Sequence, residues 1–310
     1  MMTHKRILVG LVLSVAVVIA LGCGKARKLE LERMQSLEAM ARSFMDQTDE
    51  AIASQLETVK GWARSPELAE VLGAPQSATP PAIFSSWIKQ DPANRVLLLT
   101  TSEGVVVAET SQFPEAEQSP YILPPVNERR LWELTWFNRL VEQEEPCVAD
   151  VSYRPFSHEG DLTQDELDTH VGLPVYLTFA SPVQSSPEGG PAGVLILAQS
   201  WDKWYEMGQN FETQQSKQGY ETLRVVLMNQ DNFVLLHPKK DRVLQKRMVH
   251  SPAVRDALSG NEGSRTEFLD QESEEVGLVG YAPSDGFGDY GGLGWAALMF
   301  EKRNAALKAK

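Results

Sequence analysis

The chain has 310 residues, of which 42% are hydrophobic and 23% are charged, a composition typical of a globular protein with one large or two ordinary domains. Its formal net charge of −13 argues against a nucleic-acid partner, because phosphate binding requires a basic face and no stretch gathers Lys and Arg. Cys23 and Cys147 are the only cysteines, so no disulfide framework is expected, and a lone thiol such as Cys147 is expected to be inert.

The first 28 residues have the parts of a signal or membrane anchor. Lys5 and Arg6 precede an apolar run from Ile7 to Leu21, a pattern typical of export. The run is shorter than the roughly 20 residues that span a bilayer. Three outcomes therefore stay open: a retained anchor, simple cleavage, or lipidation of Cys23, which follows the residues Ala-Leu-Gly. We expect the chain after about residue 28 to be extracytoplasmic, at the cell membrane where the segment is retained or lipidated.

A long amphipathic stalk helix is predicted over residues 29–75. Its apolar residues recur mostly at steps of three and four, which places them on one face of a helix: Leu31, Met34, Leu37, Ala41, Phe44, Ala51, Ile52, Leu56, Val59 and Trp62. At about 1.5 Å per residue, the stretch 29–72 reaches roughly 65 Å, which is more than a compact domain needs. The apolar face therefore requires a partner along most of its length, either a domain beside it or a second copy. Ser65-Pro66 and the segment 73–75 are the expected breaks.

Residues 76–200 are predicted to form a first module, which begins after a Pro-rich linker at 74–81. Two buried strands, 95–101 and 105–109, flank the residues Ser-Glu-Gly, so Gly104 is expected at positive φ in the turn of a hairpin. A helix from Asn127 to about Leu140 follows, and then three extended segments at 148–153, 171–182 and 192–198.

Residues 201–300 are predicted to repeat this order on a smaller scale. A helix at 201–218 leads into a strand pair, a short helix and three strands. The short helix, 251–258, has Ser at its cap and Pro in its first turn. The strands are expected at 224–229, 233–236, 263–269, 275–283 and 293–300, and a basic tail at 301–310 follows. Two antiparallel sheets, each with helices on one side, make an α+β fold.

Three stretches of the second module carry a resemblance to a known family: residues 225–238 (VVLMNQDNFVLLHP), 279–283 (VGYAP) and 292–298 (GLGWAAL). The module resembles the membrane-proximal half of a double Cache domain, the PAS-like extracytoplasmic sensor of bacterial chemoreceptors and sensor kinases. Residues 37–72 look like the long N-terminal helix of that family, and 95–199 look like its membrane-distal half. The resemblance implies a long N-terminal helix followed by two tandem PAS-like antiparallel-sheet modules, with a small ligand bound in the distal one.

The resemblance also implies ligand-binding residues. Family members that bind amino acids use an arginine, a tryptophan two residues on, a tyrosine next, an aspartate on the following strand, and a second aspartate near the end of the last strand. Arg130, Trp132 and Asp150 stand at suitable places, whereas Glu133 replaces the tyrosine and the stretch 194–199 contains no acid. The missing acid would pair a ligand ammonium group. A small polar or anionic metabolite is therefore expected rather than an α-amino acid.

The same residues have a chemical interpretation of their own. Arg130 can hold a carboxylate in a bidentate fork, Trp132 and Trp136 can form an apolar or cation-binding wall, and Asp150 can fix a donor. Further candidates are Tyr153 and Tyr176. The alternative is a solvated arginine and two core tryptophans, because aromatic residues at helical spacing usually belong to a core.

The remaining motifs do not support a cofactor, a metal site or a catalytic centre. The GxGxxG spacing at 286–291 is followed by a strand, whereas a dinucleotide site requires a helix there. The segment 161–172 begins like a calcium loop but has Glu166 where glycine is required. The histidines lack zinc-ligand spacing, and no nucleophile has a recognisable base. We therefore expect a binding protein and not an enzyme.

Two functions remain from these arguments. The first is a sensor module that passes its ligand state through the stalk helix or to a signalling partner protein, with a homodimer through the stalk face near Leu31 to Phe44 as a further partner. The alternative is a lipid-anchored lipoprotein that binds a solute or protein without transmembrane signalling. Mass spectrometry of the mature N-terminus distinguishes them, because a diacylglyceryl Cys23 removes any transmembrane helix. An exported hydrolase is a third class, for which the sequence marks no nucleophile.

Overall fold

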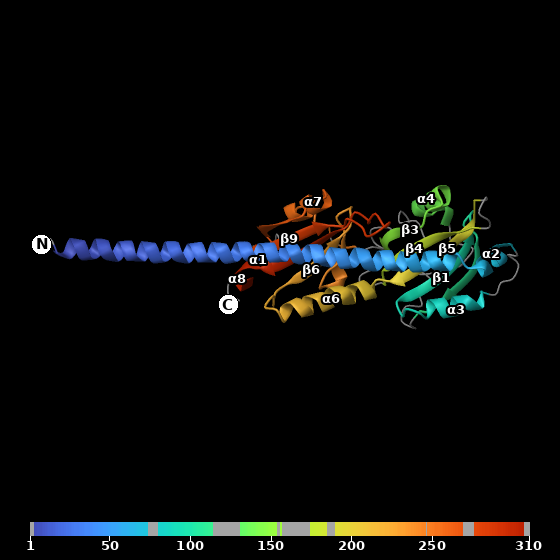
Figure 1. Ribbon diagram of the computed structural model, residues 1–310, viewed down its shortest axis with the longest axis horizontal. Coiled ribbons are helices and arrows are strands. Elements are labelled where there is room, and N and C mark those ends of the chain that lie inside the picture. Colours follow the sequence, from blue (N-terminus) through green and yellow to red (C-terminus); the bar gives the residue numbers. More distant parts are fainter. Residues whose placement is uncertain are drawn as a thin grey trace.

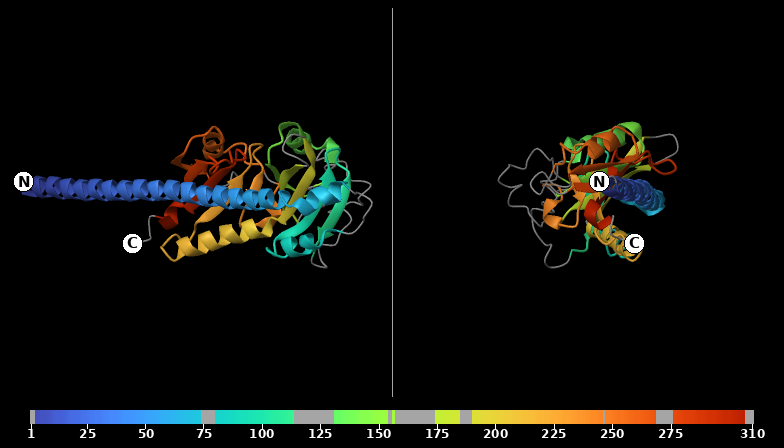
Figure 2. Two further views of the ribbon diagram at one scale, coloured as in Figure 1. Left: turned by 45° about the vertical axis from the view of Figure 1, so that its right-hand side comes forward. Right: turned by 90° about the vertical axis from the view of Figure 1, so that its left-hand side faces the viewer.

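The computed structural model describes residues 3–73, 80–113, 131–153, 156, 174–184, 190–245, 247–268 and 276–306, with side chains from residue 26 onward except Asp241. The molecule is elongated, and one helix runs along two sheet modules (Figure 1). The first part of this helix projects beyond the modules, and the last described helix lies close to the place where the projecting part meets them (Figure 2).

Helix α1 (Thr3–Ala63) is the element against which both modules pack. Its large buried side chains follow at helical spacing and form one stripe: Leu37, Phe44, Met45, Ile52, Leu56, Val59 and Trp62. The predicted apolar face is thus covered from Leu37 onward, whereas Leu31 is 54% exposed. Within the described part of the chain, no helix combines the length and apolar content that crossing a membrane requires.

The helical stretch predicted over 29–75 is divided near Ser65. Helix α1 ends at Ala63, the amide of Ser65 donates to the carbonyl of Trp62 at 3.0 Å, and α2 (Pro66–Gly73) begins. A proline has no amide hydrogen and its ring clashes with the preceding turn, so Pro66 can begin a helix but cannot continue one. Helix α2 lies at the end of the molecule that is farthest from the N-terminus (Figure 1).

The distal sheet has five antiparallel strands in the order β2-β1-β5-β4-β3. Its strands are β1 (Asn94–Thr101), β2 (Val106–Ser111), β3 (Cys147–Ser152), β4 (Tyr176–Gln184) and β5 (Pro191–Ser200). Helix α3 (Ala82–Ile88) precedes β1, and η3 (Leu131–Glu133) and α4 (Thr135–Gln143) precede β3. The predicted hairpin is confirmed, because β1 pairs with β2 and Gly104 has a φ of 81° in the turn.

The proximal sheet repeats this topology with the order β7-β6-β10-β9-β8. Its elements are α6 (Asp202–Ser216), β6 (Arg224–Met228), β7 (Val234–Leu236), η5 (Lys240–Arg242), α7 (Pro252–Leu258), β8 (Gly263–Phe268), β9 (Val276–Pro283), β10 (Ala296–Lys302) and α8 (Arg303–Ala306). Ser251 caps α7 by accepting the amide hydrogen of Val254 at 3.2 Å, as its position predicts. The corresponding strand orders confirm the predicted internal repeat.

Helices cover both faces of each sheet, so the prediction that they lie on one side only is wrong. One apolar cluster joins α1 to Leu97 and Phe179 of the distal sheet and to Met299 of the proximal sheet. The opposite faces are covered by α4, through Phe137, and by α7, through Val254. Because strand side chains alternate between faces, strands buried on both sides have nearly continuous apolar sequences. The predicted α+β class is confirmed.

Two ion pairs tie the C-terminal end of the proximal sheet to α1. The guanidinium of Arg33 donates to both carboxylate oxygens of Glu301 at 2.6 and 2.7 Å, and it lies 3.3 Å from the centre of the Tyr220 ring. One turn earlier on α1, Glu30 accepts two hydrogen bonds from Arg303, both at 2.8 Å. The end of β10 and the adjoining turn of α1 are therefore bonded as one unit.

Candidate functional site

Three of the residues predicted to bind a ligand lie apart from one another or outside the described part of the chain. Arg130 lies outside the described residues. Trp132, in η3, is 48% exposed, and its carbonyl accepts a hydrogen bond from the Asn138 side chain at 2.8 Å. Tyr176, on β4, is fully buried, and its ring meets the ring of Phe113 edge-on, with centroids 6.5 Å apart. Trp132 is thus on the surface and Tyr176 is inside the distal module.

Trp136 of α4 and Asp150 of β3 line the same cavity, which has a volume of about 860 Å³ and lies between the two modules. We call it the inter-module cavity. Helix α4 and the edge strand β3 line it on the distal side, and residues 289–293 line it on the proximal side. Besides Trp136 and Asp150, its polar lining consists of Thr135, Arg139, Gln143, Glu145, Cys147, Ser152, Thr178, Gln230, Asp289 and Tyr290.

Asp150 connects the modules through hydrogen bonds. One carboxylate oxygen accepts from the indole N–H of Trp295 at 3.0 Å, and the other accepts from the side-chain amide of Asn229 at 2.9 Å. Burial raises the pKa of Asp150, and hydrogen bonds from Val151, Asn229 and Trp295 only partly offset this rise. The carboxylate predicted to fix a ligand donor therefore already holds two donors of the proximal module.

Tyr153 makes a second link between the modules. Its hydroxyl donates to the carbonyl of Val243 at 2.8 Å and accepts from the side chain of Gln245 at 3.2 Å. Its ring is buried in the apolar cluster that contains α1. Asp150 and Tyr153 thus both fasten the edge of the distal sheet to the proximal module.

Trp136 and Arg139 are the side chains of α4 best placed to meet a ligand. The Trp136 ring is partly buried and lies edge-on to Phe137, with centroids 5.9 Å apart. Arg139 is exposed at the cavity, where its Nε donates to Gln143 Oε1 at 2.9 Å. Sequence reasoning missed Arg139, although its position three residues after Trp136 places both on one helix face. The pair offers an aromatic wall and a cation to a polar or anionic molecule.

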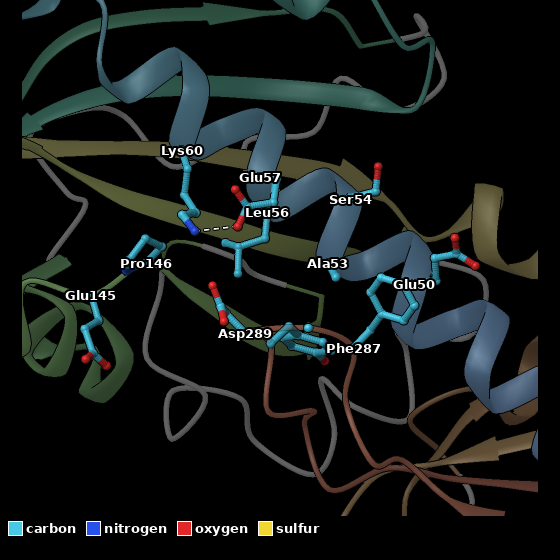
Figure 3. Close-up of a pocket in the computed structure, with 12 residues that line it drawn as sticks. Glu50, Ala53, Ser54, Leu56, Glu57, Lys60, Glu145, Pro146, Phe287 and Asp289 are labelled. Carbon is cyan, nitrogen blue, oxygen red and sulfur yellow. Dashed lines mark hydrogen bonds and ion pairs between the residues drawn. The ribbon is translucent and has the colours of Figure 1, made fainter.

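A second cavity of about 670 Å³ lies between α1 and the loop that connects β9 to β10. We call residues 284–295 the bridging loop. Figure 3 shows Glu57 and Lys60 of α1, which are hydrogen-bonded to each other, above Asp289 of this loop, with Glu145 and Pro146 at the side. Tyr290 and Asp289 line both cavities. The bridging loop is therefore a wall that the two cavities share.

Asp49 of α1 holds the first residues of the bridging loop. Its carboxylate accepts from the Ser284 hydroxyl at 2.8 Å and from the Gly286 amide at 3.1 Å. Only 2% of Asp49 is exposed. Burial raises its pKa, and the hydrogen bonds from Ser284 and Gly286 reduce the rise. Among the described residues, no group of three or more His, Cys, Asp or Glu side chains is placed to hold a metal ion.

The raised pKa of Asp49 predicts that the stability of the protein depends on pH. Because its folded-state pKa is raised above the ordinary value near 3.9, the folded state binds the proton more tightly, and stability is lost as the pH rises through the raised pKa. We expect the free energy of unfolding of Asp49→Asn, relative to the wild type, to increase in urea unfolding as the pH rises above about 4. A flat difference over this range would contradict the prediction.

Asp91 provides a control of opposite sign. Although burial opposes it, hydrogen bonds from Lys203 and from the amide of Ala93 lower the pKa of Asp91. The wild type therefore gains stability from this group as the pH rises toward about 4. The unfolding free energy of Asp91→Asn relative to the wild type should fall over that range.

Cys147, which lines the inter-module cavity, is predicted to be unreactive in the folded protein. Burial raises the pKa of its thiol to about 12, despite the neighbouring charge of Arg139. Because only the thiolate reacts, iodoacetamide at pH 8 should modify Cys147 about 10³-fold more slowly in the native chain than in the urea-unfolded chain. Peptide mass spectrometry separates it from Cys23. Equal rates in the two states would show that the thiol is open to solvent.

Comparison with known proteins finds similar proteins among solved structures only. No protein-family model matches the chain, and no curated protein sequence matches it either. Among solved structures, the ligand-binding domain of the Pseudomonas aeruginosa PAO1 amino acid chemoreceptor PctB, in complex with L-Gln, is similar, with a TM-score of 0.52 and 16% identity. The match covers 87% of this chain and 91% of that one.

Two further ligand-binding domains of chemoreceptors are similar over comparable lengths. The domain of CtaA from Pseudomonas fluorescens, in complex with L-isoleucine, has a TM-score of 0.55 and 10% identity, over 92% of this chain and 98% of that one. A domain from Campylobacter jejuni, in complex with L-valine, has a TM-score of 0.57 and 10% identity, over 91% and 97%. The chain therefore has the fold of these sensory domains, the double Cache arrangement of a long helix followed by two PAS-like modules.

Proposed function

We propose that the protein is an extracytoplasmic sensor module that binds a small polar metabolite and passes its binding state through α1 or to a partner protein. The observation that carries this proposal is the likeness to chemoreceptor ligand-binding domains over 87% or more of the chain. All three of those domains are in complex with an amino acid. Their names describe binding and not catalysis, and we propose no enzymatic activity for this chain.

We propose that the ligand binds on the distal side of the inter-module cavity, against α4. Arg130, Trp132 and Trp136 remain proposed ligand residues, and Arg139 joins them. Trp136 and Arg139 line the cavity. An amino-acid ligand is disfavoured, because β5 has no carboxylate to pair with an ammonium group. A carboxylate or another anionic group on a small metabolite suits the two arginines.

We also propose that the segment 1–28 attaches the protein to the membrane. A retained anchor would leave α1 continuous with that segment, and α1 runs without interruption from Thr3 to Ala63. The second candidate function is a binding lipoprotein, favoured by Cys23 directly after the residues Ala-Leu-Gly. Mass spectrometry of the mature N-terminus decides between the two.

A thermal-shift screen of small metabolites tests the sensor proposal. A ligand present at 100 times its Kd stabilises the folded state by about 2.7 kcal/mol. We expect this stabilisation to be lost in Arg130→Ala and in Trp136→Ala and kept in Arg255→Ala, which removes an exposed cation of α7. A ligand whose stabilisation survives both site changes would place the site elsewhere. Recovery of a chemically altered ligand would indicate an enzyme.

A further inference from the structure

The bridging loop, residues 284–295, is held at its two ends by carboxylates from different parts of the molecule. At its start, Ser284 and Gly286 donate to Asp49 of α1. At its end, Trp295 donates to Asp150 of the distal sheet. The loop belongs to the proximal module, so one short segment is bonded both to the stalk helix and to the other module.

The loop between these ends is folded tightly. Phe287 and Tyr290 exchange two backbone hydrogen bonds, at 2.8 and 3.0 Å. Gly286 has a φ of 77°, and a Cβ at this position would overlap the carbonyl oxygen of Tyr290. The backbone turn at 286–290 is therefore tightly defined, while the tip of the loop is exposed, with Phe287 50% exposed.

Tyr290 holds the middle of the loop against the apolar cluster that α1 shares with the distal sheet. It is 8% exposed and belongs to the apolar cluster that contains α1. Its hydroxyl is buried and has no hydrogen-bond partner among the described residues. Burial raises its pKa, with contributions from the charges of Asp49 and Asp150. The buried ring therefore holds the middle of the loop against the apolar cluster that contains α1.

We propose that the bridging loop couples the inter-module cavity to α1. This inference rests on the proposed function, because it requires a ligand whose hydrogen-bond donors compete for Asp150. Release of Trp295 and Asn229 from Asp150 frees the end of the loop, and the loop then loosens its hold on Asp49. The stalk helix thus receives the state of the cavity through the loop, in addition to the direct contact that Leu56 of α1 makes with the cavity.

Hydrogen exchange on the full chain without ligand tests the coupling. In Asp150→Asn, the side-chain amide faces the donor of Asn229 or of Trp295, so one of the two bonds is lost. We expect the amide of Gly286, which donates to Asp49, to exchange at least about tenfold faster than in the wild type. Trp295→Phe removes the indole donor and keeps an aromatic ring, and it should act in the same direction. The control is Glu221→Gln, an exposed acid of the proximal module outside the loop, which should leave the rate unchanged.

Coupling is reciprocal, so the experiment also runs in the other direction. Asp49→Asn should accelerate exchange of the indole N–H of Trp295 by a similar factor, which keeps the test decisive if the Asp150 variant fails to fold. Unchanged exchange in Trp295→Phe and in Asp49→Asn would overturn the coupling. Because no ligand is added, this failure is distinct from failure of the metabolite screen, which tests the sensor function itself.

Discussion

Replacing Gly280 by alanine is expected to destabilise the protein by about 3 kcal/mol, at the upper end of the usual cost of overpacking. Gly280 lies on β9 where the strand crosses α1, and a Cβ at this position would overlap the backbone carbonyl carbon of Leu37 and the amide nitrogen of Glu38. Neither atom belongs to a flexible side chain, so α1 and the sheet would have to separate. Urea unfolding monitored by circular dichroism measures the change.

Gly61→Ala is the matched control, because it makes the same chemical change within α1. No atom lies within 4 Å of a Cβ added at Gly61, and alanine is favoured over glycine inside a helix by up to about 1 kcal/mol. We therefore expect Gly61→Ala to be neutral or stabilising. Equal effects of the two substitutions would refute the close approach of β9 to α1.

Replacing Glu301 by glutamine is expected to cost about 3 kcal/mol or more, because it leaves the Arg33 guanidinium without its anionic partner. The Glu301 side chain is 1% exposed and that of Arg33 is 13% exposed. Arg33 also donates to the carbonyl of Gly219 at 2.6 Å, so the cation cannot leave the site without breaking further bonds. Thermal and urea unfolding at 0.1 and 0.5 M salt measure the loss, which should depend little on salt because both charges are shielded from water.

Glu32→Gln is the control for the ion pair of Arg33 and Glu301. Glu32 pairs with Lys28 one turn away on α1 at 3.9 Å, and the two side chains are 52% and 79% exposed. Exposed pairs of this kind contribute about 0.5 kcal/mol or less. A loss in Glu301→Gln no larger than in Glu32→Gln would mean that the buried pair does not secure β10 to α1.

The fold was largely predictable because its determinants are local. The apolar stripe of α1 repeats at helical spacing, and the strands are continuous apolar runs bounded by Gly, Pro and Ser. Boundaries were less predictable where backbone geometry decides them. Of the helix expected from 127 to 140, residues 127–130 lie outside the described part of the chain. Helix α4 runs from Thr135 to Gln143, because Leu134 adopts an extended conformation that separates it from the turn at 131–133. Ser65-Pro66 divides the stalk stretch as its chemistry predicts.

The site was less predictable, because its contacts join distant parts of the chain. Spacing correctly placed Asp150 on a strand, but no periodicity shows that this edge strand faces the other module. Its partners, Asn229 and Trp295, come from two different turns of the proximal sheet. Trp295 lies in the stretch 292–298, which the sequence distinguishes only by its resemblance to the family. An acid within the predicted strand 148–153 was the sequence signal that a polar partner had to exist.

The apolar cluster that joins α1 to both sheets limits how the two modules can be separated or exchanged. The two modules share one topology, and the same helix, α1, covers the inner face of both. A polypeptide made of residues 201–306 alone would present Leu278, Ala297 and Met299 to water. Each half therefore requires α1 beside it, and recombination that exchanges one half succeeds only if the inner face of the incoming sheet fits α1.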